Sequence, residues 1–210
     1  MYYLITNQND MTWRDRLWGP DVTHEVTNFN YYFEVYDHIP TALFMQPAYE
    51  DIKNPKIWEC SIDNPNKTSF ITMAPKVTTH KTVDFPEITK QQRITFAILC
   101  CLQIVQNPIF REWALNYLNS IDTSEESAKK TQEKLMAQMG SEEIPEEHDY
   151  ISCAHACLEA VFKDDVQNAA ANSAHRAFYD SPHQDRINLQ QLAEIALTVS
   201  PKDIAELLGH

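Results

Sequence analysis

Two cysteines and a histidine lie close together in the second half of the chain, in the run Cys153-Ala154-His155-Ala156-Cys157. Thiolate sulfur and imidazole nitrogen are side-chain ligands that zinc favours in proteins. On an α-helix, Cys153 and Cys157 share one face, whereas His155 projects roughly 200° away from both. Zinc would therefore need a non-helical turn and further ligands, and the sequence offers no second close pair. We interpret the run as buried thiols with a core or interface histidine, and predict no metal.

His24, Tyr32 or Tyr36, and Glu59 form a second candidate set, in the first half of the chain. A histidine, a tyrosine and a glutamate on strands are similar to the catalytic set of some ADP-ribosyltransferases. Because any aromatic β-region offers such a trio, a nucleotide-modifying enzyme that uses His24 and Glu59 is only an alternative. The chain has three glycines and no glycine-rich phosphate loop. The sequence therefore assigns no catalytic residue and no cofactor, and favours a protein that is not an enzyme.

Five carboxylates gather between residues 141 and 149 without any lysine or arginine: Glu142, Glu143, Glu146, Glu147 and Asp149. One interpretation is a solvated linker that also places negative charge at the N-terminus of the next helix, where the helix dipole favours it. The other is an acidic patch that docks on a basic protein surface, with charge complementarity speeding the encounter.

An aromatic and basic loop near the N-terminus is a further candidate for partner binding, because it contains Trp13, Arg14, Arg16 and Trp18. Exposed tryptophan and arginine are favoured as anchors at protein interfaces. Packing of the two tryptophans in the core or under a lid is the competing interpretation.

The chain is strongly acidic, with 17 basic and 30 acidic residues and a formal charge of −13 over 210 residues. Residues 1–87 hold seven basic and twelve acidic residues, giving −5, and residues 88–210 hold ten and eighteen, giving −8. This charge repels phosphate and anionic lipid headgroups. Direct binding of nucleic acid or of a membrane surface is therefore disfavoured.

The cysteines and the apolar runs indicate the compartment. The five cysteines are an odd number, and they suit buried free thiols in a reducing cytosol better than a disulfide framework. The first residues lack the basic and apolar regions of a secretory signal. The longest uninterrupted apolar run, Phe96 to Leu102, is far shorter than the roughly 18 residues of a membrane span.

The first half of the chain predicts a small, mostly antiparallel sheet. Its β-prone segments alternate with turn signals, and one short helix is expected after Pro40. The expected strands are 2–6, 31–36, 56–62, 69–73 and 76–83, and the expected helix is 39–48.

The second half predicts a helical bundle. The segment from Gln91 to Val105 is apolar on nearly every side of a helical wheel, so we expect this helix to be buried. Asn107 and Pro108 open an amphipathic helix whose apolar stripe runs from Phe110 to Ile121 and suits either a core or a homodimer interface. Thr123 and Glu126 form a capping-box pattern before the next helix. Further helical stripes cover 151–162, 166–178, 189–199 and 204–208.

These elements predict an α+β protein in which a small antiparallel sheet region, residues 1–87, packs on a C-terminal helical bundle, residues 88–210. We expect one continuous core, centred on the helix around Phe96 to Val105.

Several stretches resemble a family of uncharacterised proteins of tailed bacteriophages, which have a β-rich first half and a helical, often alanine-rich second half. The most specific stretch is Gln92-Arg93-Ile94-Thr95-Phe96-Ala97-Ile98-Leu99-Cys100, preceded by Pro86-Glu87-Ile88-Thr89. The others are 18–24, 54–59, Phe110 with Trp113-Ala114, and Ile187-Asn188-Leu189 leading to Ala193 and Leu197. Residues 123–178 depart from the pattern, since acidic and polar residues dilute the alanines. The resemblance implies a phage origin and the cytoplasm of a bacterial host, and it transfers no catalytic residue.

The resulting hypothesis is a phage accessory protein that binds a host or defence protein with a basic surface. An inhibitor of a CRISPR or other defence system fits this description. The partner-binding candidates are the five carboxylates of residues 142–149 together with Trp13, Arg14 and Trp18. The alternatives are the nucleotide-modifying enzyme and a minor phage structural or assembly protein.

Overall fold

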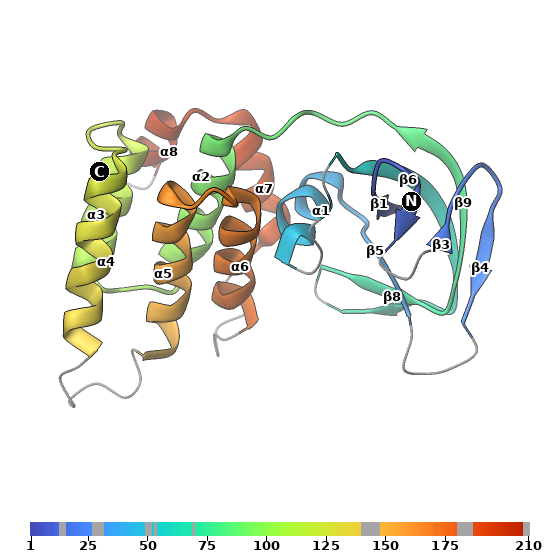
Figure 1. Cartoon of the computed structure of the whole chain (residues 1–210), viewed down its shortest axis with the longest axis horizontal. Helices are drawn as coiled ribbons and strands as arrows, with labels where there is room; N and C mark the ends of the chain where they lie inside the picture. The colour runs from blue at the N-terminus through green and yellow to red at the C-terminus, as the bar shows by residue number, and fades with distance from the viewer. Residues whose placement is uncertain are drawn as a thin grey trace. The chain divides into compact units, whose positions relative to one another are not determined.

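The computed structural model describes residues 1–12, 16–26, 32–48, 52, 54–68, 70–139, 148–179 and 187–207. Within these ranges the chain is α+β, with strands in the N-terminal half and helices in the C-terminal half (Figure 1). Two compact units divide it, Met1–Glu87 and Ile88–His210. The division falls where the composition of the sequence changes.

The first unit is built on a four-stranded antiparallel sheet with the strand order β1-β6-β9-β4. The strands are β1 (Tyr2–Thr6), β4 (Thr23–Glu25), β6 (Lys56–Asp63) and β9 (Lys76–Val83). The expected strands 2–6, 56–62 and 76–83 are thereby confirmed. Their period-2 pattern puts Leu4, Trp58, Cys60 and Val77 on one face, where they form a buried cluster.

Shorter elements complete this unit. A second sheet has the order β5-β8-β7, and a two-stranded ribbon pairs β2 with β3. The strands are β2 (Met11–Thr12), β3 (Arg16–Leu17), β5 (Phe33–Val35), β7 (Asn66–Lys67) and β8 (Thr72–Ala74), and the helices are α1 (Ile39–Met45) and the 3-10 helix η1 (Gln46–Ala48). The strand expected at 69–73 is wrong in its bounds, because the paired strands of this region are residues 66–67 and 72–74.

Helix α2 (Lys90–Leu102) is the buried helix that the sequence predicts. Every residue from Ile94 to Leu102 is buried, and the helix contacts α5, α6 and α7 within the second unit. Its N-terminus is a capping box, in which the Thr89 side chain accepts from the Gln92 backbone and the Gln92 side chain accepts from the Thr89 backbone.

The other helices that the structure describes in this unit are α3 (Pro108–Leu118), α4 (Glu125–Met139), α5 (His148–Phe162), α6 (Val166–Tyr179), α7 (Leu189–Thr198) and α8 (Pro201–Leu207) (Figure 1). Asn107 caps α3 as expected, since its side chain accepts from the backbone of Ile109 and Phe110. The cap of α4 is not Thr123 but Ser124, whose hydroxyl accepts from the backbone of Ser127.

The apolar stripe of α3 is packed inside the unit. Phe110, Trp113, Ala114, Tyr117 and Leu118 are buried, whereas Ile121, beyond the end of α3, is 71% exposed. The stripe therefore serves the core of a single chain. Among the residues that the structure describes, no helix combines the length and the apolarity needed to cross a lipid bilayer.

Candidate functional site

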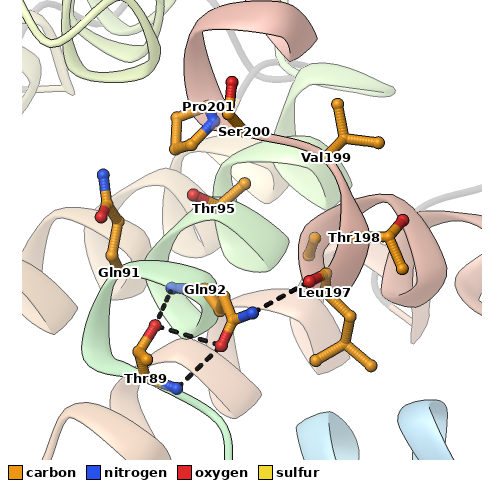
Figure 2. A pocket seen from close by; sticks show the side chains of 10 residues that line it. Thr89, Gln91, Gln92, Thr95, Leu197, Thr198, Val199, Ser200 and Pro201 are labelled. Atoms are coloured by element: carbon orange, nitrogen blue, oxygen red, sulfur yellow. Dashed lines mark hydrogen bonds between the residues drawn. The ribbon is translucent and has the colours of Figure 1, made fainter.

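A pocket opens in the helical unit between the first turns of α2 and the junction of α7 with α8 (Figure 2). Its volume is about 320 Å³, at the small end of the range for sites that hold small molecules. The residues that line it come from 89–95 and 196–201, and all of them are uncharged. Because no charged side chain lines the pocket, it suits a neutral, hydrogen-bonding occupant better than an ion.

Gln92 holds the two sides of this pocket together. Its side-chain amide nitrogen, Nε2, donates to the carbonyl of Leu197 at 3.0 Å. Its oxygen, Oε1, accepts from the backbone N–H of Thr89 at 2.9 Å and from the Thr89 hydroxyl at 3.1 Å. The same residue therefore caps α2 and fixes the end of α7 against it (Figure 2).

Thr95 lies at the centre of the lining residues in Figure 2. It is only 1% exposed, and in the described part of the chain its hydroxyl oxygen has no hydrogen-bond partner. Burying a hydroxyl without a partner is unfavourable, so this group is a local weakness of the fold. Sequence reasoning did not identify Thr95, although the pattern Thr89-x-x-Gln92 marks the start of its helix.

Most of the partner-binding candidates lie outside the described residues: Glu142, Glu143, Glu146, Glu147, Trp13 and Arg14. Asp149 is in the first turn of α5, and its side chain also lies outside the description. Its position near a helix N-terminus agrees with the dipole argument made from the sequence.

Trp18 is packed in the core of the first unit. It is 3% exposed, its Nε1–H donates to the Thr12 hydroxyl at 3.2 Å, and its ring meets those of His24 and Phe33 edge-on. Of the two interpretations of the aromatic loop, packing accounts for this residue. The interface proposed below therefore does not include Trp18.

His24 and Glu59 lie on opposite faces of the four-stranded sheet. His24 pairs with Val77, and its ring centre lies 4.6 Å from that of Trp18. Val77 and Trp18 both belong to the buried cluster, so His24 is on the same face as that cluster. The two neighbours of Glu59 in β6 also belong to that cluster, so Glu59 points the other way, where its Oε2 lies 3.6 Å from Nζ of Lys81. These two side chains share no site, and this arrangement lends no support to the enzyme built on them.

The cysteines are buried free thiols, as expected from the sequence. Cys153 and Cys157 share one face of α5 and lie within hydrogen-bonding reach of Cys101 in α2. Cys101 Sγ is 3.1 Å from the hydroxyl oxygen of Ser173, and that hydroxyl donates to the carbonyl of Cys153 at 2.9 Å. Burial raises the pKa of Cys157 well above its usual range. Within the described ranges no group of three or more histidine, cysteine or acidic residues is placed to hold a metal ion.

The charged side chains that the structure describes are exposed or half-buried. Every buried residue that the structure describes is apolar or neutral polar, without any Asp, Glu, Lys or Arg. Among the described residues, seven lysines lie within 2.6 to 3.6 Å of a carboxylate: Lys56, Lys67, Lys76, Lys81, Lys129, Lys130 and Lys163. Such exposed pairs add little stability, but each places an anion beside a cation and so lowers the local positive potential.

No protein-family model, no curated protein and no solved structure matches this chain. Its function has to be inferred from its own residues.

Proposed function

We propose that the protein is a bacteriophage accessory protein that acts by binding a host or defence protein with a basic surface. The observation that carries the proposal is the net charge of −13, together with the finding that none of the buried residues described by the structure is charged. Both units contribute to this charge, and none of the buried residues that the structure describes is charged, so the excess of carboxylates belongs to the exterior.

The distribution of the cations supports an acidic surface rather than a mixed one. Four lysines of the first unit and three of the second lie beside a carboxylate, so their charges are compensated locally. A net negative field of this kind steers a basic partner toward the protein and repels nucleic acid. A basic surface that normally holds nucleic acid is therefore the kind of partner that the charge fits.

The segment with Glu142, Glu143, Glu146 and Glu147 is the proposed centre of the contact, because it concentrates four carboxylates without a compensating base. Its test is capture of a partner from bacterial lysate at low salt, followed by a comparison of two variants. In the first, these four glutamates become glutamine.

The matched control changes Glu112, Glu125, Glu126 and Glu133 to glutamine. All four are exposed on α3 or α4, and both variants carry a net charge of −9. We expect the segment variant to weaken partner binding by about tenfold or more, and the control variant by less than about threefold. If both variants lost the same amount of affinity, general surface charge and not the segment would account for binding. If both variants bound the partner as tightly as the original protein, the acidic-surface proposal would be refuted.

A further inference from the structure

Three residues with the chemistry of a serine hydrolase meet on the exposed side of the first unit's sheet. The hydroxyl oxygen of Ser61 lies 3.1 Å from Nε2 of His80. The other ring nitrogen of His80, Nδ1, lies 3.6 Å from Oδ1 of Asp21. The serine hydroxyl is therefore at one nitrogen of the imidazole and the carboxylate is at the other. A nucleophile, a base and a carboxylate in this order form the arrangement that activates serine for acyl transfer.

The sheet register explains why these residues meet. Ser61 of β6 pairs directly with Thr78 of β9, and His80 lies two residues further along β9. Glu59 of β6 pairs with Lys81 and Cys60 pairs with Thr79, so the register shifts between them. His80, between Thr79 and Lys81, is the extra residue of a β-bulge. Such a bulge re-aims a side chain, and it brings His80 diagonally across to Ser61.

Asp21 reaches His80 from the turn that precedes β4. Its φ of 57° lies in the left-handed region, which aspartate tolerates better than most residues. The pairing of Thr23 with Thr78, with hydroxyl oxygens 2.8 Å apart, fixes this end of β4 against β9. The carboxylate therefore comes from a turn that is held in place by the sheet.

The mechanism needs the imidazole proton on Nδ1, the ring nitrogen that faces the Asp21 carboxylate. Nε2 is then the acceptor, and the Ser61 hydroxyl donates to it. We propose that Ser61 is an acyl-accepting nucleophile, that His80 is its general base and that Asp21 is a positioning residue. The exposed fractions of the His80 and Asp21 side chains are 40% and 88%, so the substrate class is small, activated acyl esters or thioesters that need no deep pocket.

The reaction divides into two balanced steps. In the first, Ser61 Oγ attacks the acyl carbon while its proton passes to His80 Nε2; the bond to the leaving group breaks, and that group takes the proton from His80. In the second, water attacks the ester on Ser61, giving its proton to His80, and the serine oxygen leaves and recovers that proton.

The neighbouring hydroxyls provide a donor for the oxyanion of this reaction. The Thr23 and Thr78 oxygens share one hydrogen bond, which uses one of their two protons. When Thr23 donates in this bond, the proton of Thr78 is free beside Ser61, because Thr78 is the direct cross-strand partner of Ser61. Since water reaches the whole site, we expect its rate enhancement to lie at the low end for general-base catalysis.

The test uses the full-length protein with p-nitrophenyl acetate as the probe. We expect release of p-nitrophenolate and an acetyl group on the peptide that contains Ser61, detected by mass spectrometry. Ser61→Ala and His80→Gln are expected to lower the rate of release by about tenfold or more. Asp21→Asn keeps the left-handed turn, so we expect the thermal midpoint to stay unchanged. It is expected to slow acetylation of Ser61 by only about two- to threefold, because water and salt screen an exposed carboxylate.

His24→Gln is the matched control for the histidine. His24 belongs to the same sheet, but its Nε2 contacts the carbonyl of Leu17 at 2.9 Å instead of a serine, and glutamine can preserve that contact. This control is expected to retain the rate of the unmodified protein. Acetylation only of lysines or the N-terminus, or a Ser61→Ala protein that cleaves the ester as fast as the original, would overturn the proposal. Ser61 is exposed, so its replacement leaves the core intact.

Discussion

Thr95 has an unusual position for a hydroxyl, because it is buried beside a pocket and has no partner within the described residues. Valine has nearly the same shape without the hydroxyl. We therefore expect Thr95→Val to raise the free energy of unfolding by about 1 kcal/mol. Denaturant unfolding measures this change.

The control for Thr95 is Thr89→Val in the same pocket. The Thr89 hydroxyl caps α2, so its loss is expected to lower the free energy of unfolding by about 1 kcal/mol. Opposite signs for these two identical substitutions, which change the size of the side chain equally, would show that hydrogen bonding decides the effect. Destabilisation by both would mean that the Thr95 hydroxyl has a partner, such as a bound water.

His155 predicts a dependence of stability on pH. Burial lowers the pKa of this imidazole, Glu159 opposes the shift and Arg176 adds to it. A histidine with a lowered pKa in the folded state contributes stability above its unfolded pKa of about 6.5, and this contribution is lost as the pH falls through the folded value. We expect His155→Gln to lose less stability than the original protein between about pH 7 and pH 5. Parallel pH profiles of the thermal midpoint would contradict this prediction.

At the scale of single residues, local spacing predicts well which side chains share a face of a helix or strand. It predicts poorly which residues far apart in the sequence come into contact. The spacing of Cys153 and Cys157 predicts that they share a buried face, and they do. Asp21, Ser61 and His80 could not be grouped from the sequence, because their meeting depends on strand register and on a bulge. Trp18 shows the same limit, because the sequence around an aromatic residue in a loop does not distinguish a buried side chain from an exposed one.

At the scale of elements, α2 is expected to dominate the stability of the helical unit. Ile98 in its centre is fully buried, and the helix contacts α5, α6 and α7. Ile98→Ala removes buried methyl groups and leaves a cavity, so we expect a loss of about 2 to 5 kcal/mol in the free energy of unfolding. Circular dichroism at the helical signal during denaturant unfolding measures it.

The matched control for Ile98 is Gln91→Ala in the first turn of the same helix. Gln91 is exposed, so this change is expected to stay within about 0.5 kcal/mol. Equal effects of the two substitutions would mean that α2 is not a core helix.

The elements that the sequence predicts correctly are those with a long periodic pattern. Helices α2 and α3 and strands β6 and β9 have such patterns, and their bounds agree within a few residues. The two-residue strands β2, β3 and β7 could not be predicted, because a period of two residues cannot establish itself over so short a segment. They are defined by their pairing with the neighbouring strand along the chain.

At the scale of the whole molecule, charge is the property that the proposed function uses. The described cores contain no charged side chain, and the net charge of −13 therefore acts at the surface. Surface charge of this kind acts over about 10 Å at moderate ionic strength and is screened by added salt. A complex that depends on it should weaken steeply as salt is added.

The most direct test of the acidic-surface account is the dissociation constant of the purified complex with its captured partner, measured by calorimetry from about 50 mM to about 500 mM salt. The account predicts that the affinity falls by about tenfold or more over this range, and that the variant with glutamine at Glu142, Glu143, Glu146 and Glu147 shows a shallower dependence. An affinity that does not change with salt, and is the same in that variant, would contradict the account.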